Sequence, residues 1–137
     1  MESVLERRPY LVPVVLGLLT VLLLKAAVLP SSGQVLDGKD LGAFVYPLYT
    51  MTGNLVRAGE LPLWNPYSFL GAPLIGNPQA ALFYPATWLV WLVGAERGIG
   101  WMLALHVWLA AWGMARLART FGASYTGGLA AGILYGM

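Results

Sequence analysis

Residues 10–29 read YLVPVVLGLLTVLLLKAAVL, a run of twenty residues whose only charged side chain is Lys25. About 20 consecutive apolar residues cross the hydrocarbon core of a bilayer, and a lysine near one end of the run can reach the headgroups. We therefore expect a transmembrane helix over residues 10–29. The alternative is a cleaved signal peptide with an apolar core over residues 11–24. The retained helix is favoured, because the following KAAVLP offers no clean small-x-small cleavage site.

The composition of the whole chain supports the same class of protein. Of its 137 residues, 58% are hydrophobic and 10% are charged, whereas soluble domains carry about 25% charged residues. The mean hydropathy is +0.68. A soluble domain of this size could not bury so much apolar surface, and disordered chains combine low hydrophobicity with high net charge. The composition predicts an integral membrane protein.

The charge pattern excludes a nucleic-acid partner. The net charge is +2 and the pI is near 9.1, but the basic residues stand singly or in pairs and form no basic stripe. Cysteine is absent, which excludes disulfides and thiolate metal sites.

A second apolar run, GIGWMLALHVWLAAWGMA at residues 98–115, has no formal charge and predicts a second transmembrane helix. A third run begins near residue 125, and its thirteen residues to the end of the sequence are too few to cross a bilayer. We therefore expect the chain to be the N-terminal part of a longer protein. The expected segments are an N-terminus at 1–9, a span at 10–29, a loop at 30–97, a span at 98–115, a link at 116–124 and the start of a third span at 125–137.

Basic residues sort the predicted loops to the two sides of the membrane. Arg7 and Arg8 precede the first span, and Arg116 and Arg119 lie in the link. Cytoplasmic loops carry an excess of lysine and arginine. The long loop at 30–97 has only three basic residues, Lys39, Arg57 and Arg97. The sequence therefore predicts an all-α, polytopic membrane protein of the bacterial cytoplasmic membrane, with a cytoplasmic N-terminus and an outer loop at 30–97.

The outer loop begins with a predicted amphipathic helix. Asp40 is placed as an N-cap, Gly59 as a stop, and Pro47 should kink or restart the helix. Such a helix would lie along the membrane surface. The apolar residues at helical spacing are Leu41, Phe44, Val45, Leu48, Leu55 and Val56.

The second half of the loop predicts irregular structure. Five prolines between residues 61 and 85 argue against regular elements, so this backbone belongs outside the membrane or in a cavity. Residues 86–94 are expected to form an interfacial helix. A re-entrant or spanning segment that begins near Ala80 is the alternative.

Asp37 and Asp40 are the candidate catalytic residues. They follow the first predicted span, where partial desolvation would raise the pKa of a carboxylate and strengthen it as a general base. Two carboxylates three residues apart are also a candidate pair of ligands for a divalent cation. The alternative is that Asp40 only caps a helix and that Asp37 only forms a turn with Gly38.

Aromatic and amide side chains of the loop are candidate substrate contacts. The set comprises Trp64, Asn65, Tyr67, Asn77, Gln79 and Tyr84. An aromatic belt at the headgroups is the favoured interpretation for Trp88 and Trp91. For Trp64 and Tyr67 two interpretations are equally favoured. One is the aromatic belt, and the other is a platform that stacks on a sugar face or packs against a polyprenyl chain. The amides would bond ligand hydroxyls or, equally, groups of the loop backbone.

His106 is the sole histidine and lies in the middle of the second predicted span. Polar groups inside spans are functional candidates by default, so His106 joins the candidate substrate-binding residues. A neutral imidazole bonded to a neighbouring helix is the alternative. Walker-type loops, histidine metal motifs and a specific Ser-His-Asp set are missing from the sequence.

Several motifs of the loop resemble those of the YfhO-type bacterial membrane proteins. The central one is RAGELPLWNPY at residues 57–67, preceded by GKD at 38–40 and by Tyr46-Pro47. The likeness continues through GAPL at 71–74, NPQA at 77–80, FYP at 83–85, Leu105-His106, Gly113-Met114 and RTFG at 119–122. It covers roughly residues 36–137.

The resemblance implies a membrane-embedded glycosyltransferase of the GT-C type. Such proteins take a sugar from a polyprenyl-phosphate donor at the outer face of the membrane and pass it to an envelope glycan or lipid acceptor. It implies that Asp40, in the family's Gly-x-Asp, is the general base or the acceptor-binding carboxylate, with Asp37 as a helper or bystander. The phosphate would be neutralised by a divalent cation or by arginines outside this chain, and a chain of this length is expected to be inactive alone.

Two other classes of function stay open. A transporter or flippase would use His106 and other polar groups within the membrane. A non-catalytic assembly factor would use Asp37 and Asp40 only as helix caps, and their replacement would then change stability but not turnover.

Overall fold

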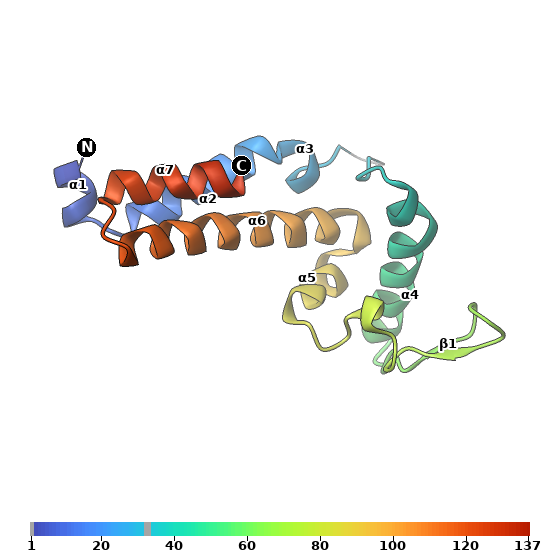
Figure 1. Ribbon diagram of the computed structural model, residues 1–137. Coiled ribbons are helices and arrows are strands. Elements are labelled where there is room, and N and C mark those ends of the chain that lie inside the picture. The colour runs from blue at the N-terminus through green and yellow to red at the C-terminus, as the bar shows by residue number, and fades with distance from the viewer. Residues whose placement is uncertain (1, 32–33) are drawn as a thin grey trace. The chain divides into compact units, whose positions relative to one another are not determined.

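The computed structural model describes residues 2–31 and 34–137 (Figure 1). Helices make up 68% of the chain, and the described strands are two residues long each, so the all-α class is confirmed. The chain divides into two compact units. Unit 1 comprises Met1–Val28 and Leu103–Met137, and unit 2 comprises Leu29–Met102.

Unit 1 is built from helices. Its elements are α1 (Glu2–Arg7), α2 (Leu11–Leu23), α3 (Lys25–Val28), most of α6 (Ala95–Thr120), and α7 (Tyr125–Gly136). The expected helix over residues 10–29 is thus two helices, because Leu24 departs from helical geometry with φ −98° and ψ 24°. Ser124 caps α7, since its hydroxyl accepts a hydrogen bond of 3.1 Å from the amide of Gly127.

The backbones of α6 and α7 approach each other through small residues. Gly128, Gly132 and Gly136 recur every fourth position of α7 and so lie on one face. A Cβ atom added at Gly132 would lie 2.7 Å from the carbonyl oxygen of Ala111, and one at Gly136 would lie 2.5 Å from the Cβ of Ala111. Only glycine therefore fits at these positions, and the arrangement follows the small-xxx-small pattern of membrane helix pairs.

A tryptophan joins α2 to α6. The indole Nε1 of Trp108 donates a hydrogen bond of 2.8 Å to the carbonyl of Pro13. Gly17 leaves room for this ring, because a Cβ atom there would lie 3.3 Å from the same nitrogen. Trp112 stacks on Trp108 with a centroid separation of 5.6 Å. Around these contacts the buried core of unit 1 comprises Leu5, Val12, Leu16, Ala111 and Ala115.

Unit 2 begins with a helix that contains one π-helical turn. The turn, η1 (Leu41–Val45), continues directly into α4 (Tyr46–Arg57), and the amide of Tyr46 bonds the carbonyl of Leu41. Pro47 lies in the first turn of α4, where its missing N–H breaks the i→i−4 pattern. The expected restart at Pro47 thus takes the form of this turn, and Gly59 with φ +80° follows the helix end as expected.

The prediction that Asp40 caps this helix is wrong. Helical structure already begins at Lys39, and Asp40 has helical dihedral angles, φ −74° and ψ −30°, with no capping hydrogen bond from its side chain. An N-cap residue requires non-helical backbone angles so that its side chain can reach the free amides of the first turn.

A short hairpin follows in the stretch expected to be irregular. Strands β1 (Trp64–Asn65) and β2 (Ala72–Pro73) pair antiparallel, and the amide of Leu74 extends the ladder to the carbonyl of Leu63 at 2.7 Å. So short a strand tolerates a proline at its end. Gly71 has φ +113°, and a Cβ atom there would lie 2.5 Å from the indole of Trp64, so a glycine is required on both grounds.

The remaining elements of unit 2 are η2 (Pro78–Ala80), α5 (Pro85–Val93) and the first turns of α6. The helix expected over residues 86–94 is found as α5, and its location at a membrane interface stays a prediction. Its nine residues rise about 13 Å, less than half the thickness of a hydrocarbon core. The backbone of α5 at Val90 lies so close to Gly98 that a side chain at Gly98 would collide with it. The buried residues of unit 2 include Leu48, Tyr49, Leu74, Ala80, Leu82, Val90, Ala95 and Ile99.

Within the described residues, α6 is the one helix long and apolar enough to cross a membrane by length and composition. Helix α2 is apolar but shorter, with thirteen residues.

Replacing Gly132 by alanine should destabilise the α6–α7 pair. The added methyl would lie 2.7 Å from a backbone oxygen, and such overpacking lowers the free energy of unfolding by about 1–3 kcal/mol. The matched control is Gly127→Ala, an exposed position on the same helix where the nearest atom would be 3.5 Å away and where alanine adds up to about 1 kcal/mol. Unfolding in detergent, followed by circular dichroism, measures both; an equal loss in the two variants would contradict the packing.

Candidate functional site

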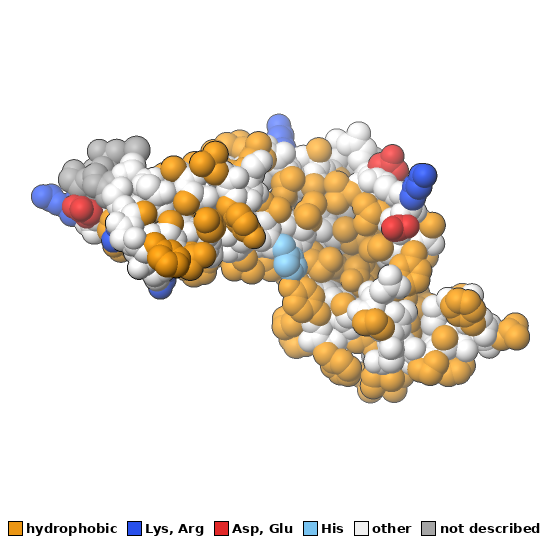
Figure 2. Space-filling model, viewed as in Figure 1, with side chains coloured by type: hydrophobic (Ala, Val, Ile, Leu, Met, Phe, Trp, Pro, Cys, Tyr) orange, Lys and Arg blue, Asp and Glu red, His pale blue; other side chains and the backbone are white. Residues whose placement is uncertain are grey.

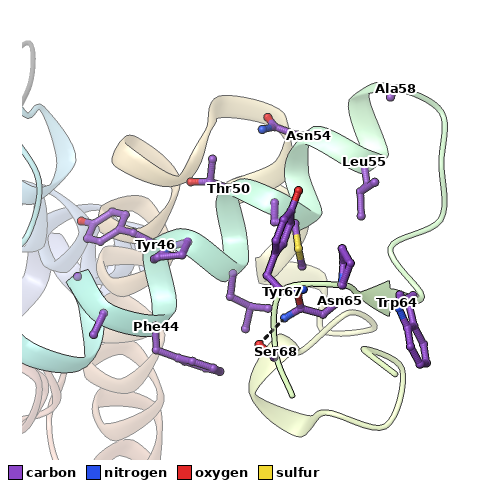
Figure 3. Close-up of a pocket in the computed structure, with 16 residues that line it drawn as sticks. Phe44, Tyr46, Thr50, Asn54, Leu55, Ala58, Trp64, Asn65, Tyr67 and Ser68 are labelled. Atoms are coloured by element: carbon purple, nitrogen blue, oxygen red, sulfur yellow. Dashed lines mark hydrogen bonds between the residues drawn. The ribbon is translucent and has the colours of Figure 1, made fainter. Parts of the chain in front are cut away.

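A pocket of about 1050 Å³ lies in unit 2, between the η1–α4 helix and the hairpin (Figure 3). The helix contributes, among others, Phe44, Thr50 and Leu55, and the hairpin contributes Asn65 and Tyr67. The full lining is Gly42, Ala43, Phe44, Tyr46, Pro47, Leu48, Thr50, Met51, Asn54, Leu55, Ala58, Trp64, Asn65, Pro66, Tyr67 and Ser68.

None of the residues that line this pocket carries a charge. Aromatic and aliphatic side chains make up most of the wall, and the polar groups are amides and hydroxyls, as at Thr50, Asn54 and Ser68. Ligand sites typically combine apolar walls with a few polar groups that fix orientation. This pocket therefore suits a ligand that presents hydroxyl groups and apolar faces.

The helix side of the pocket follows from helical periodicity. Gly42, Tyr46, Thr50, Asn54 and Ala58 recur at every fourth position, so they share one face of the η1–α4 helix. The prediction for this helix rested on its apolar residues and missed this stripe, whose polar members are Tyr46, Thr50 and Asn54. Its spacing was the signal that could have found it.

The hairpin side brings together three of the predicted substrate contacts, Trp64, Asn65 and Tyr67. The Oδ1 atom of Asn65 accepts a hydrogen bond of 2.9 Å from the amide of Tyr67, and its Nδ2 atom donates one of 3.0 Å to the hydroxyl of Ser68. Asn65 therefore shapes the turn that places Tyr67 against the pocket. Trp64 and Tyr67 are both exposed.

The other predicted contacts do not line this pocket. Asn77 caps η2, with its Oδ1 atom accepting from the amide of Gln79 at 2.9 Å, while the side chain of Gln79 is exposed. Tyr84 is the residue before α5. His106 is half-buried on α6 within unit 1. Asn77 and Asn65 thus each accept a hydrogen bond from an amide of the loop backbone.

Asp37 and Asp40 are both exposed. The Oδ1 atom of Asp37 accepts a hydrogen bond of 2.8 Å from the amide of the next residue, Gly38; the turn that the sequence predicted here stays a prediction. Asp40 lies two residues before Gly42, where the pocket lining begins. Among the residues described, no group of three His, Cys, Asp or Glu side chains could hold a metal ion.

Arg57 of the RAGELPLWNPY motif fixes the helices that flank the pocket. Its guanidinium donates a hydrogen bond of 2.9 Å to the carbonyl of Trp91, near the end of α5. It donates a second one, of 2.7 Å, to Oδ1 of Asn54. The indole N–H of Trp91 in turn donates a hydrogen bond of 3.1 Å to the hydroxyl of Thr52. Two hydrogen bonds thus join α4 to α5. One of them comes from Arg57, which also bonds the pocket residue Asn54.

The expectation of an aromatic belt fits Trp88 better than Trp91. Trp88 is half exposed, whereas Trp91 is partly buried against the core of unit 2 and its N–H is bonded within the protein.

No protein-family model, curated protein or solved structure matches this chain.

Replacing Arg57 by glutamine should loosen α5. The variant loses the bond to the Trp91 carbonyl, and a single net hydrogen bond contributes about 1 kcal/mol. We expect faster amide hydrogen exchange over residues 85–93, measured by mass spectrometry. Lys39→Gln removes the same charge at an exposed position and serves as the control. Unchanged exchange in the Arg57 variant would contradict the role assigned to these bonds.

Proposed function

We propose that this chain is part of an integral membrane protein and that α6 crosses the bilayer. Its 26 residues rise about 39 Å, more than the roughly 30 Å of a hydrocarbon core. Only 28% of its most apolar window is buried within the protein. The core helix of a soluble protein would be mostly buried, so lipid is the environment that suits this surface. The basic residues before the first apolar run and at 116–119 support a cytoplasmic location for the N-terminus and the link at 116–124.

Unit 2 then lies at the outer interface. No charged residue occurs from residue 61 to residue 95, and the tip of the hairpin exposes Tyr67 at 85% and Phe69 at 94% of their surfaces. Figure 2 shows orange hydrophobic side chains over most of the visible part of this region. Uncharged surfaces rich in aromatic residues are favoured at the headgroup level of a bilayer.

We further propose that the protein belongs to a membrane glycosyltransferase-like machine, which transfers a sugar from a polyprenyl-phosphate donor to an envelope acceptor. The observation that carries this proposal is the uncharged pocket of unit 2. Segments that resemble the YfhO-type proteins, Tyr46-Pro47 and Trp64–Tyr67, meet around it. Amides and hydroxyls suit the hydroxyl groups of a sugar, and the aromatic wall suits its apolar faces.

In the proposed reaction an acceptor hydroxyl oxygen attacks the anomeric carbon of the donor. A new glycosidic bond forms, the bond from the anomeric carbon to the phosphate oxygen breaks, and polyprenyl phosphate leaves. Asp40 takes the hydroxyl proton as general base, with Asp37, three residues earlier, as a helper or a bystander. A divalent cation at these two carboxylates stays a prediction, and no step of this scheme depends on one.

The test compares two carboxylates of one segment. Membranes that carry the full-length protein, of which this chain is expected to be the N-terminal part, are supplied with radiolabelled undecaprenyl-phosphate hexoses, and the release of undecaprenyl phosphate is measured. We expect Asp40→Asn to lower the rate by about a hundredfold or more, the contribution of a general base. Asp37→Asn, the matched control, should retain most of the rate.

Two results would contradict the scheme in different ways. Wild-type turnover in the Asp40→Asn variant would refute the role of Asp40. Failure of the wild-type protein to consume any donor would refute sugar transfer as the function.

A further inference from the structure

A second pocket, of about 280 Å³, lies in unit 1. It is formed where the beginning of α2, the end of α6 and the beginning of α7 meet, and its two charged residues are both arginines. The lining is Pro9, Tyr10, Val12, Pro13, Trp112, Ala115, Arg116, Arg119, Tyr125 and Gly128.

One face of α6 supplies the charges and part of the apolar wall. Trp112, Arg116 and Arg119 are spaced by four and three residues, so they lie on the same side of the helix. These three residues therefore line the pocket from the α6 side. Across the pocket, Pro9, Val12 and Pro13 add further apolar surface from the α2 segment.

Arg119 is held in position by its surroundings. Its guanidinium carbon lies 3.8 Å from the centre of the Tyr125 ring, a cation–π contact, and its Nη1 atom donates to the carbonyl of Ala123. Gly128 leaves space for the arginine stem, since a Cβ atom there would lie 3.2 Å from Cγ of Arg119. A guanidinium has five N–H donors, so this bond leaves others for a ligand.

The guanidinium of Arg116 has no hydrogen bond or ion pair with any residue that the structure describes. Unit 1 contains five lysine and arginine residues against two glutamates, Glu2 and Glu6, which is an excess of positive charge. Two of the five, Arg7 and Arg8, directly precede Pro9 of the pocket. An exposed arginine in a basic, partly apolar hollow favours an anionic ligand that also carries hydrocarbon.

We propose that this pocket binds the phosphate group of an anionic phospholipid, with the first methylenes of the lipid chains against the Pro9, Val12 and Trp112 surface. Guanidinium groups bind phosphate oxygens through paired hydrogen bonds, and basic pockets between membrane helices on the cytoplasmic side hold such headgroups. The inference rests on the proposed membrane location of unit 1, and it is independent of sugar transfer.

The experiment measures lipid retention by native mass spectrometry of the full chain in detergent. Phosphatidylglycerol and phosphatidylcholine with identical acyl chains are the two probes. We expect the wild-type chain to retain phosphatidylglycerol preferentially. Arg116→Gln should weaken this retention about tenfold, as expected for the loss of one charge-assisted hydrogen bond. Arg97→Gln removes an arginine from the same helix but outside the pocket, and it should leave retention unchanged.

A third variant separates geometry from charge. Tyr125→Leu keeps both arginines but removes the ring beneath Arg119, and we expect weaker retention of phosphatidylglycerol with unchanged helix content by circular dichroism. Equal retention of the two lipids by the wild-type chain, or equal effects of Arg116→Gln and Arg97→Gln, would overturn the proposal. Displacement of the lipid by millimolar inorganic phosphate would identify a free anion as the ligand and would also overturn it.

Failure of this inference is distinguishable from failure of the proposed function. A chain that inserts into membranes but shows no lipid preference refutes only the headgroup site. A chain that is not retained by membranes refutes the membrane location itself.

Discussion

The close approach of α6 and α7 is the contact on which unit 1 depends. Glycines at every fourth position of α7 bring its backbone against the Ala111–Ala115 face of α6. In the proposed membrane setting, lipid chains are as apolar as leucine, so burial of apolar surface would not hold the helices together, and close packing and hydrogen bonds would do so. The Trp108 bond to the Pro13 carbonyl adds α2 to this pair. The same approach brings Tyr125 and Gly128 to Arg119, which builds the basic pocket at one end of the three helices.

Unit 2 has an aromatic surface, and hydrogen bonds help to hold it together. Its loops carry backbone amides and carbonyls that need hydrogen-bond partners. Asn65 and Asn77 satisfy amides of their own turns, and Arg57 links α4 to a carbonyl of α5. The wall of the larger pocket contains no charged residue. Residues of the RAGELPLWNPY motif thus serve two purposes: Arg57 braces the helices, and Trp64, Asn65 and Tyr67 form the wall.

The helices could be predicted where the apolar runs are long and where glycine or proline ends them, as at Gly59 and Pro85. Other features depend on contacts between distant segments. The hairpin was missed because strands of two residues show no periodicity, and its turn depends on the fit of Gly71 against Trp64. The glycine stripe of α7 is visible in the sequence, but its partner on α6 is not. The cap assigned to Asp40 was wrong because the helix begins one residue earlier, at Lys39.

The central claim is that α6 crosses a membrane, with unit 2 outside and the link at 116–124 inside. The chain contains no cysteine, so each single-cysteine variant reports one position. Glu60→Cys and Phe121→Cys both fall at exposed sites, and a membrane-impermeant maleimide is applied to bacterial cells before and after permeabilisation. The account predicts labelling of the Glu60→Cys variant in intact cells and of the Phe121→Cys variant only after permeabilisation. Equal labelling of both variants in intact cells, or of neither before permeabilisation, would contradict it.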